Sequence, residues 1–226
     1  MTYVFIHGSG CTGEVFAAQS AAFAGSIAPT LPGHGTPGSP CSIDEFADFV
    51  AAELAGRDLR DAILCGSSMG GAIALTLGLR RDPRVRALVL IGSGARLRVA
   101  PAMLERLESD FAAGARELAP WFFAEPEPAR VEAAVRSMLL VGQAQTLRDF
   151  RACDAFDVTE RLGELSLPLL ALTGEHDRLT PPKYAAFLAD RVPGASARIL
   201  PGAGHLAMVE RPDEANAALR AFAELT

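Results

Sequence analysis

One serine of this sequence lies in a setting that could make it a nucleophile. Gly66-Ser67-Ser68-Met69-Gly70 matches the pattern G-x-S-x-G. An apolar run over 62–65 predicts a buried strand before it, and residues 71–79 predict a helix after it. A nucleophile elbow needs this order of strand, tight turn and helix. Ser68 is therefore expected at the tip of a strained turn. A Cβ would not fit two residues before or after it, which explains both glycines.

A serine hydroxyl is a poor nucleophile at neutral pH, so it needs a base, and the base needs an acid. Asp177 follows an apolar segment over 167–173, and His205 follows another over 197–200. Open α/β sheets build their sites on loops at the carboxyl ends of strands. The chain order Ser68, Asp177, His205 is the one expected with a G-x-S-x-G elbow. We therefore predict that these three residues form a catalytic triad.

Other histidines and acidic residues are weaker candidates for the base and the acid. His7 ends a predicted strand and His34 lies in a turn rich in proline and glycine, so both are expected to shape loops. His176 adjoins Asp177 and is expected to face solvent. The competing acids are Glu175, which would point away if Asp177 points inward, and Asp154 and Asp157, which belong to another segment.

Backbone N–H groups are expected to stabilise the oxyanion of an acyl-transfer reaction. The first is the N–H of Met69, the residue after the predicted nucleophile. The second comes from the loop Gly8-Ser9-Gly10, which follows an apolar strand over 3–7. The Ser9 amide is the first choice there and the Gly10 amide the second.

The elements that must position these residues alternate between short apolar strands and helices. Strands are predicted over 3–7, 26–29, 62–65, 85–92, 167–173 and 197–200. Helices are predicted over 16–23, 42–55, 71–79, 182–190 and 212–225, the second of them capped by Ser42 with Glu45. Such alternation is typical of a parallel sheet covered on both faces. The sequence predicts an α/β fold with a mostly parallel sheet of about six strands.

Residues 95–165 break this alternation, because they show helical spacing and no strand. One crossover needs only a single helix, so about 70 residues exceed it several-fold. We interpret 95–165 as a helical lid inserted between sheet strands, with 1–94 and 166–226 as the core. The lid contains an aromatic cluster at 121–123. Two explanations for it are equally good: it lines a substrate pocket, or it packs the lid on the core. The candidate pocket residues are Gly8, Gly10, Trp121, Phe122, Phe123, Met138, Leu139 and Leu206.

Composition limits the other classes of function. The 226 residues carry a formal net charge of −6 and no basic cluster, which argues against a nucleic-acid partner. No apolar stretch reaches the ~18 residues of a membrane span, and the first residues do not resemble a signal peptide, so a cytoplasmic location is expected. None of the four cysteines has C-x-x-C spacing, so no metal site is expected. Cys11, beside the Gly8–Gly10 loop, is expected to have a packing role.

Several segments resemble the α/β-hydrolase superfamily over essentially the whole chain. They are Val-Phe-Ile-His-Gly-Ser-Gly at 4–10, Thr-Leu-Pro-Gly-His-Gly at 30–35, Gly-Ser-Ser-Met-Gly-Gly at 66–71, Gly-Glu-His-Asp at 174–177 with Thr180-Pro181-Pro182, and Gly-Ala-Gly-His at 202–205. The resemblance implies that a first antiparallel hairpin of the family's eight-stranded sheet is missing here. With Thr30-Leu31 before its Pro-Gly-His-Gly turn, the chain resembles the carboxylesterase and monoacylglycerol-lipase branches. Its C-terminal stretch, 180–206, equally resembles the enol-lactonases.

The expected activity is that of a serine carboxylic-ester hydrolase on small, fairly apolar esters, through an acyl-enzyme on Ser68. No metal or organic cofactor is implied. A lactonase is the first alternative, followed by a lyase, a synthase or a perhydrolase that uses the same triad. A non-enzymatic ligand receptor on the same fold is disfavoured by the complete triad. The expected partner is a small-molecule ester, and self-association as a homodimer is left open.

Overall fold

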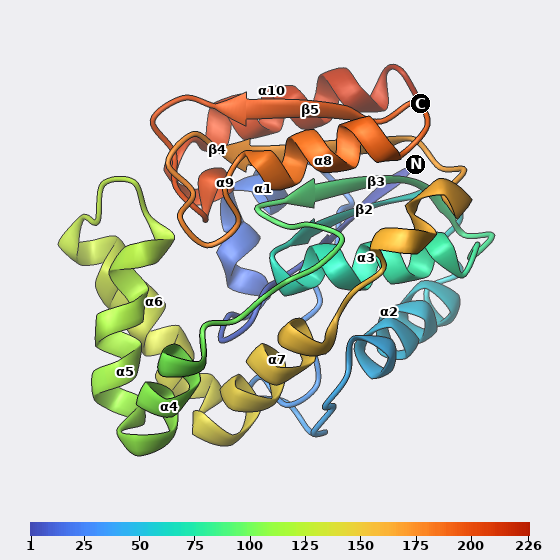
Figure 1. The fold of residues 1–226 in the computed structure, drawn as a ribbon. Coiled ribbons are helices and arrows are strands. Elements are labelled where there is room, and N and C mark those ends of the chain that lie inside the picture. The colour runs from blue at the N-terminus through green and yellow to red at the C-terminus, as the bar shows by residue number, and fades with distance from the viewer.

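A single parallel sheet organises the computed structural model, which describes all 226 residues. Its five strands lie side by side in chain order, and every neighbouring pair is parallel. They are β1 (Thr2–Ile6), β2 (Ala62–Ser67), β3 (Val85–Ile91), β4 (Leu169–Gly174) and β5 (Ser196–Leu200). Helices separate consecutive strands (Figure 1), which confirms the predicted α/β class.

The sheet has five strands rather than about six, because the segment predicted as a strand over 26–29 forms only one bridge. Ile27 pairs in parallel with Val4 at the outer edge of β1. Its N–H donates to Tyr3 O at 3.0 Å, and its carbonyl accepts from Phe5 N–H at 2.8 Å. Pro29 follows two residues later and has no N–H to donate, so the ladder cannot continue.

Alternate residues of β1 to β4 face two separate layers of helices, whereas β5 is an edge strand with mostly exposed residues. Leu64 and Leu90 point into the layer of α2 (Ile43–Gly56), α3 (Met69–Leu79) and α8 (Lys183–Arg191). Ile63 and Val89 point to the opposite layer, which contains η1 (Gly13–Phe16), α1 (Ala17–Ala22), α9 (Ala207–Glu210) and α10 (Pro212–Ala223). Figure 1 shows α2, α3 and α8 on the near face of the sheet and α10 on the far face. Both layers bury strand residues, which explains the nearly continuous apolar runs in the sequence.

The segment between β3 and β4 is helical, with no strand. It contains α4 (Pro101–Ser109), α5 (Phe111–Leu118), η2 (Ala119–Phe122), α6 (Pro128–Val141), α7 (Gln143–Ala155) and η3 (Thr159–Glu164). Proline occupies the first helical position of α4 and α6, where its missing N–H costs nothing. Figure 1 shows α4, α5 and α6 beyond the arrowheads of the strands, at the edge where the predicted site residues lie.

This helical insertion is continuous with the core of the sheet. Leu107 of α4, Leu118 of α5 and Met138 of α6 belong to the same buried cluster as Ile63 and Val89. At the end of α7, Ala152 and Cys153 belong to the cluster on the other face of the sheet, with Leu64 and Leu90. The insertion therefore spans the carboxyl edge of the sheet and contacts both layers.

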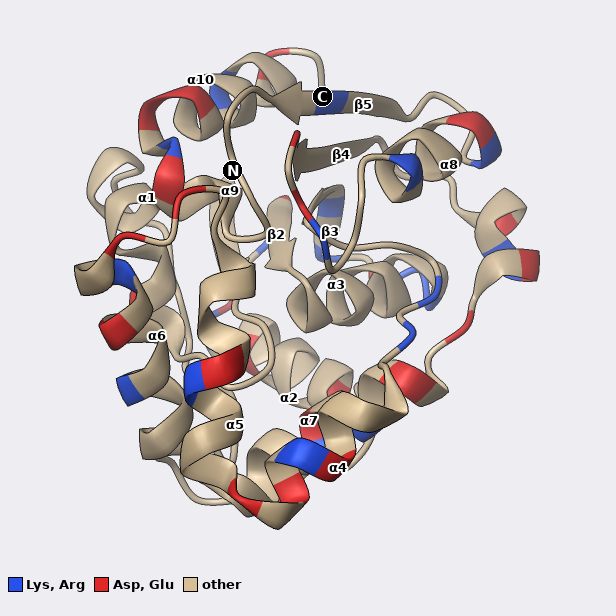
Figure 2. Ribbon diagram, turned by 60° about the vertical axis from the view of Figure 1, so that its left-hand side comes forward, with Lys and Arg blue, Asp and Glu red and all other residues tan.

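Basic and acidic residues are interspersed along α4 to α7 and α10 (Figure 2). No helix is both long enough and apolar enough to cross a lipid bilayer. A cytoplasmic location and self-association stay predictions.

Candidate active site

Ser68 lies in the sharp turn between β2 and α3, in the strained backbone conformation that the pattern predicts. Its φ is 52° and its ψ is −116°. A Cβ on Gly66 would collide with the carbonyl oxygen of Gly70, and one on Gly70 would collide with that of Ile6. Both positions are therefore restricted to glycine. The turn is held by Ser68 N–H, which donates to Ile91 O at 2.9 Å, and by Ser68 O, which accepts from Ser93 Oγ at 2.8 Å.

Asp177 and His205 meet at the carboxyl ends of β4 and β5. His205 Nδ1 lies 2.9 Å from Asp177 Oδ2 and 3.1 Å from Oδ1, and both side chains are buried. A carboxylate can only accept, so the proton of neutral His205 is on Nδ1 and Nε2 carries the lone pair. Thr180 Oγ1 donates to Asp177 Oδ2 at 2.8 Å and lies 3.2 Å from His205 Nδ1.

The Asp177 carboxylate is held in its ionised form. Oδ1 accepts from the N–H groups of Leu179 and Thr180, each at 2.9 Å. Burial alone raises the pKa of Asp177, but the charge of His205 and the hydrogen bonds from His205 and Thr180 lower it more, so the net change is downward. An ionised acid at this place fixes the tautomer of His205 and stabilises its cation.

Gly92, directly after β3, lets the acid and the base approach each other. It has a φ of 53°, and a Cβ there would lie 3.1 Å from His205 Nδ1 and 3.2 Å from Asp177 Oδ2. Only glycine combines this conformation with this space. Nothing in the local sequence around Gly92 identifies it, because its constraint comes from two loops more than 80 residues away.

The loop Gly8-Ser9-Gly10 passes directly over Ser68. A Cβ on Gly8 would lie 3.1 Å from Ser68 Cβ. Ser9 N–H donates to no protein group, and Met69 is the first residue of α3, where an N–H has no partner within the helix. Ser9 Oγ donates to Met69 Sδ at 3.6 Å, so these two residues are neighbours. The two amides predicted for the oxyanion hole thus belong to neighbouring residues beside Ser68 and have no hydrogen-bond partner of their own.

His7 shapes this loop, as its position in the sequence indicates. Its side chain is completely buried. Nδ1 donates to Gly8 O at 3.0 Å, and Nε2 accepts from Leu31 N–H at 2.9 Å. This bonding requires the neutral ring. Burial, with a smaller contribution from His34, lowers the pKa of His7 from 6.5 to about 3.

The neutral His7 predicts that the fold loses stability on acidification. The unfolded chain binds a proton on His7 near pH 6.5, whereas the folded protein does so only near pH 3. This contribution is fully present above pH 6.5 and is lost as the pH falls toward 3, by at most about 1.4 kcal/mol per pH unit. Urea unfolding between pH 7 and 4.5 measures the slope. His7→Gln, which cannot titrate, is expected to show a shallower slope, and equal slopes would contradict this account of His7.

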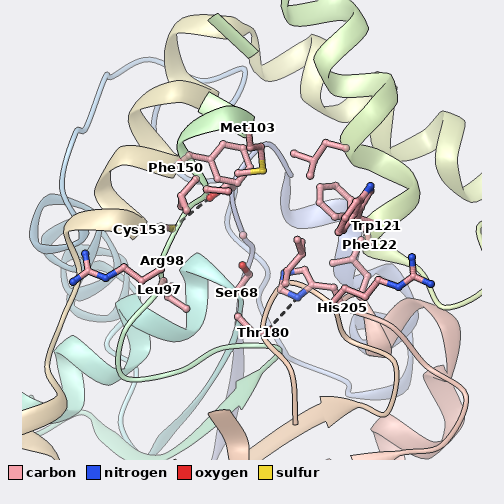
Figure 3. Close-up of a pocket in the computed structure, with 18 of the residues that line it drawn as sticks. Ser68, Leu97, Arg98, Met103, Trp121, Phe122, Phe150, Cys153, Thr180 and His205 are labelled. Carbon is pink, nitrogen blue, oxygen red and sulfur yellow. Dashed lines mark hydrogen bonds between the residues drawn. The ribbon is translucent and has the colours of Figure 1, made fainter. Parts of the chain in front are cut away.

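A cavity of about 530 Å³ opens above Ser68, between the sheet edge and the insertion. Figure 3 shows Ser68 and His205 both directed into it, with Trp121 and Phe122 beside His205 and with Met103 and Phe150 on the opposite wall. Most of its lining is apolar. No hydrogen bond joins Ser68 to His205 here; such contacts often shorten only when substrate binds.

Four of the eight predicted pocket residues line the cavity, namely Gly8, Trp121, Phe122 and Leu206. The other four do not. Phe123 is buried behind the His205 loop, where its backbone lies against Gly204. Gly10 faces Met138 of α6 and not the cavity, and Met138 packs on it behind the loop. Leu139 is 40% exposed on the outer surface of α6, since adjacent helical residues point about 100° apart.

The cavity also contains residues that the sequence did not reveal. Met103, Phe150 and Leu97 supply apolar surface, and Arg98 and Arg178 are also part of the lining. They come from α4, from α7 and from connecting segments. Helical periodicity marks the apolar face of each helix, but only the packing of the helices shows which end of that face reaches Ser68.

A buried acid, Glu210, fixes the loop that carries His205, and the sequence alone did not identify it. Glu210 accepts from Gly204 N–H at 2.6 Å and from Ala124 N–H at 3.0 Å. Leu206 N–H donates to Phe122 O at 2.9 Å. The insertion therefore holds the His205 loop through backbone bonds.

The alternative candidates for the base and the acid lie outside the group formed by Ser68, Asp177 and His205. His176 is exposed, 3.7 Å from Glu175. Asp154 and Asp157 pair with arginines at the surface of the insertion. Cys11 lines the cavity, and burial is the main reason that the pKa of its thiol rises to about 12. No three His, Cys, Asp or Glu side chains are grouped so that they could hold a metal ion.

Comparisons with known proteins agree with this fold. The family model described as "Alpha/beta hydrolase family" matches residues 3–218. A pimeloyl-[acyl-carrier protein] methyl ester esterase of Nitrosomonas europaea is 28% identical, over 81% of this chain and 79% of its own. The 3-oxoadipate enol-lactonase 2 of Acinetobacter baylyi is 29% identical, over 84% and 74%. A solved thermophilic esterase is 34% identical with a TM-score of 0.88, and the match covers 98% of this chain and 89% of the esterase. The chain therefore belongs to the alpha/beta hydrolase family, among its esterases and lactonases.

Proposed function

We propose that this protein hydrolyses carboxylic esters through an acyl-enzyme on Ser68. The observation that carries the proposal is the hydrogen bond between Asp177 and His205 Nδ1 at 2.9 Å, because it leaves Nε2 of His205 to act as a base in the cavity that also contains Ser68. Ser68 on its elbow, and the amides of Ser9 and Met69, supply the nucleophile and the oxyanion donors.

The reaction takes place in two halves. His205 Nε2 accepts the Ser68 proton while Ser68 Oγ bonds to the ester carbonyl carbon. The N–H groups of Ser9 and Met69 stabilise the resulting oxyanion, by about 3 kcal/mol each. The carbon–oxygen bond to the alcohol then breaks, and His205 gives its proton to the alcohol. Water, deprotonated by His205, attacks the acyl-enzyme in the same way and releases the acid.

The cavity favours a small substrate with an apolar acyl or alcohol group. About 530 Å³ is within the range of small-molecule sites, and apolar side chains form most of its walls. We assign the helical insertion, residues 95–165, the role of a lid over this cavity. A lactone is the second candidate substrate, because an enol-lactonase is among the relatives. A lactone would react by the same steps, with its alcohol staying attached to the acyl group.

A panel of p-nitrophenyl esters with acyl chains of two to twelve carbons, and of five- and six-membered lactones, tests this proposal. We expect turnover of the short and medium esters, and stoichiometric labelling of Ser68 by a fluorophosphonate. Turnover of lactones alone would favour the second candidate. An unlabelled Ser68 and no turnover of any ester or lactone would contradict the proposed hydrolase.

A further inference from the structure

Asp149 is a completely buried acid that the reaction steps above do not use. It lies on α7 of the insertion, and its carboxylate accepts three hydrogen bonds. Oδ2 accepts from His34 Nε2 at 2.9 Å and from Gly10 N–H at 3.2 Å. Oδ1 accepts from Gln145 Nε2 at 2.9 Å. A buried carboxylate is tolerated only when its oxygens are paired in this way.

The bond to Gly10 connects Asp149 of α7 to the oxyanion loop, Gly8-Ser9-Gly10. Gly10 follows Ser9 directly and is held through both of its backbone polar groups, because its carbonyl accepts from Ser137 Oγ of α6 at 3.0 Å. The carbonyl of Gly8, on the other side of Ser9, accepts from His7 Nδ1 at 3.0 Å. Ser9 N–H is the donor left free between these fixed groups.

His34 connects Asp149 to the rest of this loop region. Its Nδ1 lies 3.0 Å from Pro32 O, and this contact fixes the orientation of the ring so that Nε2 faces Asp149. The rings of His34 and His7 are 4.7 Å apart in an edge-to-face arrangement. Asp149 therefore contacts Gly10 directly and reaches the other side of Ser9 through His34 and His7.

We propose that Asp149 is a positioning residue that orients the Ser9 amide toward the oxyanion. The proposal rests on the proposed function. Its physical basis is that an oxyanion donor is useful only when its direction is fixed before the charge develops. Asp149 belongs to the insertion, so it also makes the geometry of the oxyanion loop depend on the docking of α7.

Asp149→Asn tests this role with almost no change of shape. Gln145 Nε2 also donates to Pro40 O, and Gln145 Oε1 accepts from Arg148, so the Gln145 amide is fixed. An asparagine has only one acceptor oxygen. Its NH₂ group faces the Gln145 Nε2 donor in one orientation and the Gly10 N–H donor in the other. We expect kcat on p-nitrophenyl butyrate to fall about 10- to 100-fold, less than complete loss of an oxyanion donor causes, and KM to change less than about threefold.

A second measurement separates positioning from general damage. A trifluoromethyl ketone forms a tetrahedral adduct whose oxyanion needs the Ser9 amide, whereas the matching alcohol binds only as a ground-state ligand. Asp149→Asn should weaken inhibition by the ketone at least tenfold and inhibition by the alcohol less than threefold. Asp110→Asn is the matched control, because Asp110 also accepts from a backbone N–H of the insertion, that of Ala113 at 3.1 Å, but does not contact the loop.

Each outcome decides the proposal. A selective loss of kcat and of ketone inhibition supports it. Wild-type kcat in Asp149→Asn, or an equal loss of both inhibitors, overturns it. If Asp149→Asn does not fold, Ser137→Ala frees the Gly10 carbonyl, the other backbone group that holds this residue, and a kcat reduced less than twofold would then overturn the proposal. Absence of turnover and of Ser68 labelling in the wild type would overturn the proposed function as well, so the two failures are distinguishable.

Discussion

Replacing Ser68 with alanine is expected to lower kcat toward p-nitrophenyl esters by about five orders of magnitude. The substitution removes the hydroxyl that points from the elbow into the cavity that His205 also lines. The oxyanion amides stay in place, so a residual rate of about 10³-fold over water is expected. Substrate binding should change little, because the cavity walls are unaltered. Steady-state kinetics, with labelling by a fluorophosphonate, measures the loss.

The adjacent serine is the matched control for this experiment. Ser67 Oγ is buried in β2 and has no hydrogen-bond partner, so Ser67→Ala removes a hydroxyl one residue away without breaking a bond. We expect that variant to keep kcat within about threefold and to be labelled normally. Activity of Ser68→Ala within a factor of ten of the wild type would show that another residue is the nucleophile.

Asp177→Asn is expected to lower kcat by about 10⁴ while the fold stays intact. The N–H groups of Leu179 and Thr180 both point at Oδ1 and will retain the oxygen of the amide there. The NH₂ group is therefore forced to the position of Oδ2, where it donates to His205 Nδ1. That bond moves the histidine proton to Nε2, so the base has no lone pair to take the Ser68 proton.

Measuring kcat together with the thermal midpoint separates this effect from unfolding. Asp190→Asn, at an exposed pair with Arg191, is the control for the same chemical change and should behave as the wild type. An Asp177→Asn variant that retains a tenth or more of wild-type kcat would direct attention to the competing acids Glu175, Asp154 and Asp157.

The parts of the site that the sequence predicted are those whose constraints are local. Gly66 and Gly70 are restricted by atoms within one turn and its neighbouring strand, so the pattern of residue types carries the geometry. Asp177 and His205 each follow a strand directly, and parallel strands bring such positions to one edge of the sheet. The succession of short apolar runs and helical segments was sufficient to predict the sheet itself. The exception is Ile27, whose pairing ends after one bridge because Pro29 follows.

The parts that the sequence did not predict depend on how helices pack. Met138 and Leu139 both suit an apolar pocket, yet one is buried behind the oxyanion loop and the other is exposed. Asp149 occupies a buried position on α7, and its partner His34 is 115 residues away in the chain. No spacing rule connects them, because the contact exists only once α7 lies across the edge of the sheet.

The contacts of the insertion with both core clusters limit how this enzyme can be re-engineered or can diverge. Exchanging residues 95–165 as one cassette would remove Ala152 and Cys153 from one cluster and Leu107 and Leu118 from the other, and would take Asp149 with them. A graft of residues 101–141, from α4 through η2 to α6, would replace Met103, Trp121 and Phe122 in the cavity wall and leave α7, with Asp149, on the sheet. It would still exchange Leu107 and Leu118 of one core cluster. Gly142, between α6 and α7, is a suitable end for such a graft, since it has a φ of 83° and open space around it. The graft must keep Ser137 and the backbone at Phe122 and Ala124, because these groups hold Gly10 and the His205 loop.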